Sequence, residues 1–384
     1  MIVGVPKERF PGETRVALVP AALAKLRKSG LDILIEAGAG AASGYPDAAY
    51  VAEGAEIVGA RDVLCDRAEI ILRVRTGGAE PTQAADELAL LRAGQRLIGM
   101  MEPLGEAQFV QAIAERGVEA FALELIPRIS RAQSMDVLSS MATLAGYKAV
   151  LLAANNLQKI YPLMMTAAGT LTAARVLVVG VGVAGLQAIA TSRRLGAIVE
   201  AYDIRPAVKE QVQSLGAKFV ELELEAQRAE SEGGYAQAQG EAFYQRQRQL
   251  MAEVVARNDV VMTTASVPGK APPTLITAEM VHGMAPGSII VDLAAERGGN
   301  CALTQPGQTV EVNGVKIMGP VNLPATVPFH ASQMYSRNIA TFLLHLLKDE
   351  RDADGPTTDE IVLETRVTQG GQVVHPRLSV EMAD

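Results

Sequence analysis

The segment that most constrains the fold is residues 175–203, which read RVLVVGVGVAGLQAIATSRRLGAIVEAYD. Val176–Val179 is an unbroken apolar, β-branched stretch, which predicts a strand buried on both faces of a parallel sheet. Ala184–Leu195 predicts a helix, and Ile198–Tyr202 predicts a second strand. A strand, helix and strand in this order predict a Rossmann-type βαβ unit.

Glycines occupy the turn between the first strand and the helix in the pattern G-x-G-x-x-G. In this pattern the first glycine permits a tight turn, the second lets the backbone approach a pyrophosphate, and the third lets the helix pack on the strand. The helix N-terminus would hold the phosphates. The residues expected to contact the dinucleotide here are Gly180, Gly182, Val183, Ala184, Gly185, Asp203, Ile204 and Arg205.

The acid that ends the second strand decides which dinucleotide we expect. Asp203 would accept hydrogen bonds from the adenosine ribose and would repel a 2′-phosphate. Arg205 lies two residues further on and leaves the alternative open, because an arginine near this position can accommodate that phosphate. We expect NAD(H) rather than NADP(H).

The remaining sequence predicts two α/β domains. Short apolar runs alternate with helical patterns in the N-terminal part, which indicates a mostly parallel sheet; these runs are Ile2–Val5, Asp32–Glu36, Ile70–Val74, Arg96–Met100 and Val118–Leu123. Helical spacing over 134–163 and 333–348 predicts two long helices that cross between domains. We therefore expect an α/β fold of two Rossmann-like, doubly wound parallel-sheet domains joined by long crossing helices. The first would comprise 1–135 plus 335–384, and the second 145–330.

Composition excludes several classes of protein. The chain has 384 residues, 49% of them hydrophobic, with a formal net charge of −8 and only 4% aromatic residues. An acidic chain with few stacking side chains is not expected to bind nucleic acid. Two distant cysteines, Cys65 and Cys301, give neither a disulfide framework nor a metal site. Prolines interrupt the longest uncharged run, 317–336, so we expect no direct insertion into a membrane.

A polar loop with the sequence ELIPRISRAQSMDVLSS spans residues 124–140. Its hydrogen-bonding groups crowd together where we expect two domains to meet, and ligands bind in such clefts. The simpler interpretation is that Ser134 or Asp136 caps a helix that begins near Val137. A second polar segment, 221–249, has a solvated surface helix pair as its simpler interpretation and a mobile flap as its functional one.

At these residues the chain resembles a known family. PRISRAQSMD, LAGY, MMTAAGT, VGVGVAGLQAIAT, GGY, PGK, DLAAERGGN and VHP are similar to segments of the NAD(H)-binding domain I of proton-translocating nicotinamide nucleotide transhydrogenase. The resemblance covers nearly the whole chain, and its length is that of the separate alpha-subunit chain of some bacteria. One departure is TLTAAR before the first strand of the fingerprint, where family members have a pair of prolines.

The resemblance implies hydride transfer between NAD(H) on this chain and NADP(H) on a partner subunit, coupled to proton translocation by membrane-spanning subunits. It implies a homodimer located peripherally on the cytoplasmic face of the inner membrane, and the tail at 361–378 is a candidate contact hairpin. It assigns catalytic roles to Arg128, Gln133, Asp136 and Ser139, and nucleotide contacts to Gln133, Ser134, Met135, Asp136, Gly234, Tyr235, Gln247 and Ser266. Hydride transfer between nicotinamides requires positioning and no general acid or base.

Two alternatives remain. Alanine dehydrogenase is a related NAD enzyme with the same two-domain plan, but its chemistry requires a lysine and a histidine in the first domain. Here Arg75 stands in place of the lysine, IGMMEPLG in place of the histidine segment, and the histidines are His282, His330, His345 and His375. The other alternative is a non-enzymatic NAD-binding module, which would have no need of the polar loop.

Overall fold

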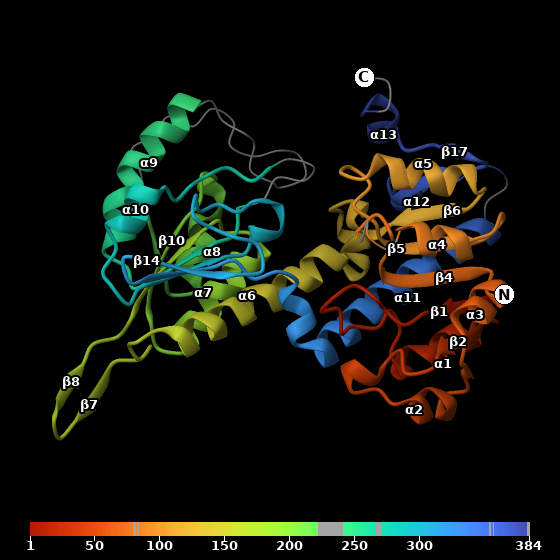
Figure 1. Ribbon diagram of the computed structural model, residues 1–384, viewed down its shortest axis with the longest axis horizontal. Coiled ribbons are helices and arrows are strands. Elements are labelled where there is room, and N and C mark those ends of the chain that lie inside the picture. Colours follow the sequence, from red (N-terminus) through yellow and green to blue (C-terminus); the bar gives the residue numbers. More distant parts are fainter. Residues whose placement is uncertain are drawn as a thin grey trace. The chain divides into compact units, whose positions relative to one another are not determined.

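The computed structural model describes residues 1–79, 82, 84–221, 241–265, 271–352, 355 and 357–381, with the backbone alone at 241–245, 247, 352 and 379–381. The chain divides into two compact units (Figure 1). The first comprises Met1–Met141 and Ala325–Asp384, and the second comprises Ala142–Pro324.

The first unit is built on an eight-stranded sheet in the order β17-β16-β6-β5-β4-β1-β2-β3. Its strands are β1 (Ile2–Val5), β2 (Asp32–Glu36), β3 (Glu56–Val58), β4 (Ile70–Arg75), β5 (Arg96–Met100), β6 (Glu119–Ala122), β16 (Arg366–Gln369) and β17 (Gln372–Val373). Strands β1 to β6 are parallel, whereas β16 pairs antiparallel with β6 and with β17. The strand order therefore reverses between β1 and β4, as in a doubly wound fold.

Helices cover this sheet and close its core. They are α1 (Pro20–Lys28), α2 (Asp47–Ala52), α3 (Arg61–Arg67), α4 (Ala84–Leu90), α5 (Ala107–Glu115), α11 (Pro328–Asp352), α12 (Glu360–Thr365) and α13 (Pro376–Glu381). Tyr335 of α11 is fully buried, and its hydroxyl donates to the carbonyl of Arg73 over 2.8 Å. Phe342 of α11 meets Phe121 of β6 edge to face at 5.7 Å. Both contacts fix α11 to the sheet.

The second unit has a seven-stranded sheet in the order β11-β10-β9-β12-β13-β15-β14. Its strands are β9 (Arg175–Val179), β10 (Ile198–Tyr202), β11 (Lys218–Phe219), β12 (Val260–Thr263), β13 (Ile289–Asp292), β14 (Thr309–Val312) and β15 (Val315–Met318). All are parallel except β14. Among the described residues, four helices lie wholly in this unit: α7 (Val183–Arg194), α8 (Lys209–Ser214), α9 (Glu241–Ala256) and α10 (Ala278–His282). A fifth, α6 (Val137–Asn156), begins in the first unit and continues into the second.

Burial on both faces explains the apolar run in β9. Val176 and Val178 belong to one core cluster, and Leu177 and Val179 belong to another on the opposite face. Successive strand residues point to opposite faces, so a strand covered on both sides has no polar position. The predicted α/β fold with Rossmann-like parallel sheets is confirmed in both units.

The predicted crossing helices differ from the observed ones. The pattern over 134–163 resolves into a short 3-10 helix, Ser130–Met135, and then α6, which ends at Asn156. Helix α6 includes residues of both units, and α11 begins three residues after the chain returns to the first unit at Ala325. By length and composition α6 could span a membrane, but a buried core helix passes the same test, and Ala149, Val150 and Ala153 are fully buried in the core of the second unit.

A hairpin that the sequence did not predict extends from the second unit (Figure 1). Strands β7 (Met164–Thr166) and β8 (Gly169–Leu171) pair only with each other, and every residue of both is exposed. A two-stranded hairpin without a core is marginally stable in water. Its exposed apolar side chains include Leu163, Met164, Met165 and Leu171, and Met165 is 79% exposed.

Candidate functional site

The turn after β9 is built so tightly that only glycine fits at two positions. Gly180 has φ +96°, and an added Cβ would lie 2.7 Å from the hydroxyl of Thr264. That hydroxyl donates to the Gly180 carbonyl over 2.9 Å. A Cβ on Gly185 would lie 2.0 Å from the same carbonyl oxygen. The first and third glycines of the fingerprint therefore serve the turn and the helix–strand contact.

Gly182 differs from its neighbours because it faces open space. It is exposed, its φ is −83°, and an added Cβ would meet no atom within 4 Å. It caps α7, whose first backbone N–H groups are not consumed within the helix. The open space at Gly182 lies beside the N-terminus of α7, and a Cβ would occupy part of it. Such a space fits the pyrophosphate of a dinucleotide.

A glycine outside the fingerprint lets a neighbouring helix approach the same turn. Gly146 of α6 lies so close to the start of α7 that an added Cβ would be 2.2 Å from the carbonyl oxygen of Ala184. This contact explains the glycine inside the otherwise unbroken helical pattern of α6, where glycine costs about 1 kcal/mol relative to alanine. Val183 and Ala184 are half-buried at this contact.

Asp203 directly follows β10, and its carboxylate is buried and hydrogen-bonded at both oxygens. Its Oδ2 accepts from the backbone N–H of Val181 over 2.7 Å. Arg205 donates to Oδ1 from its backbone N–H and its Nε, each over 2.9 Å, and to Oδ2 from Nη2 over 2.8 Å. The backbone contact aims the carboxylate at the glycine turn, and the guanidinium pairs with both of its oxygens.

The structure describes only part of the predicted nucleotide contacts. Ile204 is half-buried directly after Asp203. Gly234, Tyr235 and Ser266 lie outside the described residues, as does most of the predicted flap, and Gln247 is described only as backbone within α9. The strand that precedes Ser266 is present as β12.

In the first unit, the polar loop forms the 3-10 helix Ser130–Met135. Asn338 of α11 donates from Nδ2 to the carbonyl of Ser134 over 2.9 Å, and Met135 is buried beneath the loop. Arg128, Gln133 and Ser134 are exposed. The loop therefore presents the predicted hydrogen-bonding side chains outward from a backbone that is held in place.

Asp136 and Ser139 act together at the start of α6. The Asp136 carboxylate accepts from the Ser139 backbone N–H over 2.8 Å and from its hydroxyl over 2.5 Å. This is the hydrogen bonding of a helix N-cap, and it agrees with the simpler interpretation of Asp136. The predicted catalytic roles of both residues remain predictions.

An anchor of the loop was missed by the sequence reasoning. The guanidinium of Arg131 donates to Oδ2 of Asp359, whose Oδ1 accepts from His345 Nε2 over 3.1 Å and caps α12 through Ile361 and Val362. Although burial opposes it, these donors lower the pKa of Asp359 to about 2. The only sequence signal was an aspartate directly before a helical pattern, so its ion pair could not be foreseen.

Two arginines of the first unit share one buried carboxylate, that of Glu13. Arg15 is 2% exposed and forms a two-point ion pair with Glu13, with Nε–Oε1 at 2.7 Å and Nη2–Oε2 at 2.6 Å. Arg75 lies 3.6 Å from the same carboxylate and stacks over Phe10. Arg15 therefore has a structural partner inside the first unit. Among the residues that the structure describes, no group of His, Cys, Asp and Glu could hold a metal ion.

Comparisons with known proteins match the chain from end to end. The alanine dehydrogenase/PNT N-terminal domain family matches residues 4–145, and the corresponding C-terminal domain family matches residues 149–376. An NAD(P) transhydrogenase subunit alpha chain of Rhodospirillum rubrum is 46% identical over 382 residues, which cover 99% of both chains. Alanine dehydrogenase of Bacillus subtilis is 30% identical and covers 85% of this chain and 81% of its own. A solved transhydrogenase structure from Sinorhizobium meliloti superposes with a TM-score of 0.84 at 43% identity, covering 98% of this chain and 99% of that chain.

Proposed function

Because the chain belongs to the alanine dehydrogenase/PNT family and its more similar relatives are NAD(P) transhydrogenase alpha subunits, we propose that it is the NAD(H)-binding component of a transhydrogenase. In this proposal, hydride passes between NAD(H) on this chain and NADP(H) on a partner subunit. Membrane-spanning subunits couple the transfer to proton translocation, and this chain lies peripherally on the cytoplasmic face of the inner membrane.

The observation that carries the proposal is the full-length 46% identity to a transhydrogenase alpha subunit, combined with the glycine turn of the second unit. The fold alone does not distinguish the two activities in the family, because both kinds of relative share it. The side chains distinguish them: Arg75 stands where the dehydrogenase requires a lysine, Arg15 is already paired with Glu13, and the first unit has no histidine before His330.

The residues of this chain have a positioning role in the proposed reaction. Gly182 and the N-terminus of α7 would hold the pyrophosphate, and Asp203 would hold the adenosine ribose. When bound, NAD(H) supplies or accepts the hydride. Arg128 and Gln133 would orient the nicotinamide end toward the second nucleotide, and Asp136 and Ser139 fix the helix start on which this loop depends. A displacement of about 1 Å costs on the order of a hundredfold in rate.

We also infer that the chain forms a homodimer. The hairpin β7–β8 supports this, because it exposes Leu163, Met164, Met165 and Leu171 and has no core of its own. A second copy that covers it would bury these side chains. The sequence favoured the tail at 361–378 as the contact, but β16 and β17 of that segment pair into the sheet of their own unit.

The proposal is tested by reconstituting the chain with membranes that carry the partner subunits. We expect NADH-dependent reduction of an NADP analogue, and loss of that transfer in Gln133→Asn. Gln111→Asn on α5 of the same unit is the matched control and should retain the wild-type rate. Normal transfer by Gln133→Asn would show that the loop has no role.

The dehydrogenase alternative predicts that the chain is active without partner subunits. Alanine-dependent reduction of NAD by the chain alone, without partner subunits, would overturn the proposal. A module that only binds NAD(H) would show neither activity, even when the partner subunits are present and nucleotide binding is normal.

A further inference from the structure

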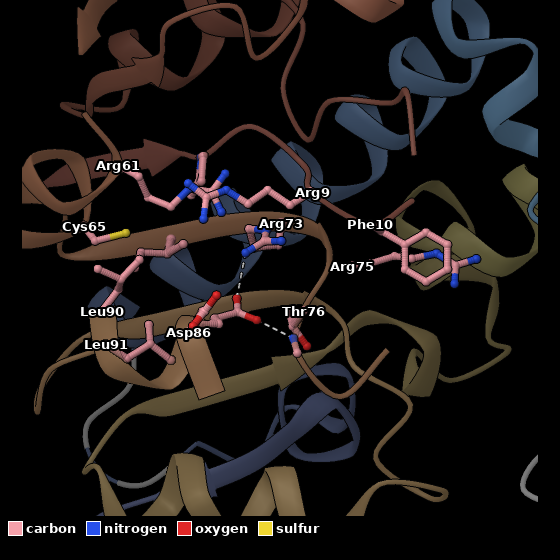
Figure 2. A pocket seen from close by; sticks show the side chains of 14 residues that line it. Arg9, Phe10, Arg61, Cys65, Arg73, Arg75, Thr76, Asp86, Leu90 and Leu91 are labelled. Carbon is pink, nitrogen blue, oxygen red and sulfur yellow. Dashed lines mark hydrogen bonds and ion pairs between the residues drawn. The ribbon is translucent and has the colours of Figure 1, made fainter. Parts of the chain in front are cut away.

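A recess in the first unit lies where the strand order of its sheet reverses. It opens at the carboxyl ends of β1 and β4 and has a volume of about 530 Å³, including its mouth to solvent. Open α/β sheets bind ligands at this position. The lining includes Arg9, Arg61, Arg73, Thr76 and Leu90 (Figure 2).

Three guanidinium groups converge on the recess from three separate segments. In Figure 2, Arg9 from the loop after β1 and Arg61 from α3 extend toward one another, and Arg73 of β4 lies beside them. The side chains of Arg61 and Arg73 are each only 9% exposed. Guanidinium groups are planar forks that match the geometry of phosphate and carboxylate.

Buried acids hold two of these arginines in fixed positions. Arg73 pairs with Glu8 over 3.2 Å and with Glu87 over 2.9 Å. Arg61 donates from Nε to Oε2 of Glu36 over 3.0 Å, and its Nη2 lies 2.9 Å from the same oxygen and donates to the carbonyl of Lys7. That Glu36 oxygen also accepts from the backbone N–H of Lys7. Held in this way, the guanidinium groups are preorganised and would lose little conformational entropy on binding a ligand.

Like charges lie close together around Arg61, and two acids, Asp86 and Glu87, also line the recess. Burial and the like charges of Arg73 and Arg9 lower the pKa of the Arg61 guanidinium, and the single acid Glu36 does not offset them. A bound anion would relieve this repulsion in a site where charge is poorly screened.

A buried hydroxyl gives a second, independent indication of a ligand. Thr76 at the end of β4 is fully buried and lines the recess, and its Oγ1 has no hydrogen-bond partner among the described residues. A buried hydroxyl without a partner has lost its hydrogen bonds to water without replacing them, which is unfavourable. The hydroxyl can donate to an oxygen of a ligand in the recess.

We propose that this recess is a second ligand site, which binds a small oxyanion through Arg9 and Arg61 with Arg73 and the Thr76 hydroxyl beside them. The site belongs to the first unit and is separate from the glycine turn of the second. The shared chemistry is that of inorganic phosphate and simple carboxylates, and the experiment distinguishes these two sources.

The test is calorimetric titration of the full-length chain with phosphate and, separately, with acetate, in the presence of saturating NADH. NADH occupies the glycine turn, which would otherwise compete for phosphate. We expect saturable binding of at least one anion below about 10 mM, weakened about tenfold or more by Arg61→Gln. Arg67→Gln on the same helix is the matched control, because Arg67 forms an exposed ion pair with Glu56 outside the recess.

Arg9→Gln provides a second variant if Arg61→Gln lowers the melting temperature, because Arg9 is exposed and its loss should not disturb the core. Phosphate binding alone, or acetate binding alone, identifies the source of the oxyanion and supports the site. No binding of either anion, or equal weakening by Arg67→Gln, would overturn it. Neither variant should alter NADH affinity, so failure of this site is distinguishable from failure of the proposed function.

Discussion

The guanidinium of Arg205 lies against the carboxylate of Asp203, with Nε 2.9 Å from Oδ1 and Nη2 2.8 Å from Oδ2. Both side chains are nearly buried, at 11% and 5% exposure. The residue that would bind the ribose and the residue that would accept a 2′-phosphate are thus paired with each other. Selectivity between NAD(H) and NADP(H) depends on which of them a ligand releases.

Arg205→Ala should therefore sharpen the preference for NAD(H). Without the guanidinium, two carboxylate positions of Asp203 become available to ribose hydroxyls, and we expect NADH to bind about threefold more tightly. NADPH, deprived of a cation for its phosphate, should bind more weakly. Calorimetry with both nucleotides measures this, and weaker NADH binding by the variant would contradict it. Asp203→Asn removes the group that would bind the ribose, and it should reduce NADH affinity about tenfold.

Two glycines of the turn should respond differently to alanine. At Gly182 the added methyl group meets no protein atom, so Gly182→Ala should keep the wild-type melting temperature and lose NADH affinity. At Gly185 the methyl group would be 2.0 Å from the Gly180 carbonyl, so Gly185→Ala should cost about 2 kcal/mol or more of folding stability. Thermal melts with and without NADH separate the two effects. A stable Gly182→Ala protein with unchanged NADH affinity would mean that the open space is not the pyrophosphate cradle.

Asp359 should act as a positioning residue for the loop that carries Gln133. Asp359→Asn keeps a good helix cap but loses the ion pair with Arg131, and we expect transfer in the reconstituted complex to fall about fivefold. NADH affinity should not change. Glu56→Gln removes an exposed ion pair in the same unit and is the control. A double-mutant cycle with Arg131→Gln tests the coupling, and additive effects would exclude it.

Glu124 should make folding stability depend on pH near neutrality. Its Oε1 accepts from the N–H groups of Met101 and Glu102, but its Oε2 is buried without a partner among the described residues, and burial raises its pKa to about 7. Between about pH 4.5 and 7 the native state therefore keeps a proton that the unfolded chain releases. The free energy of unfolding falls as the pH rises through this range.

Glu124→Gln is neutral at every pH and should remove this dependence. We expect the variant to match the wild type near pH 4.5 and to exceed it at pH 8 by on the order of 2 kcal/mol. Urea denaturation at several pH values measures the difference. A constant difference across the range would show that Glu124 does not titrate there.

Met165 should be needed for the proposed dimer. Met165→Asp places a charge on the most exposed apolar side chain of β7–β8 and should shift the chain toward monomer in sedimentation. Val63→Asp changes an exposed apolar residue of α3, which is 46% exposed in the other unit, and should leave the oligomeric state unchanged. A dimer that survives Met165→Asp would place the interface elsewhere.

Periodicity predicted the sheets well because each strand carries its own local signal. Ile2–Val5, Asp32–Glu36 and Arg96–Met100 are strands with the predicted bounds. The mostly parallel pairing of these strands also follows from their alternation with helices. What periodicity could not show was that Asp136 ends the 3-10 helix and starts α6, because both segments have similar composition.

Only those parts of the candidate site that form a local sequence motif could be predicted. The tight turn could be predicted from its glycines, because the steric limits that require glycine act within a few residues. The pairing of Asp203 with Arg205 depends on side-chain rotamers, and the anchor of Arg131 depends on a residue more than two hundred positions away. The recess of converging arginines has no motif, because its members come from three segments that only the folded sheet brings together.

The hairpin β7–β8 has a consequence for how this chain can change over evolutionary time. Because it contributes nothing to either core, its sequence is free of the packing constraints that hold the rest of the chain. In the proposed homodimer, substitutions there would alter which copies associate without altering the residues of the glycine turn. Two such chains in one cell could therefore diverge into separate assemblies while they retain the same chemistry.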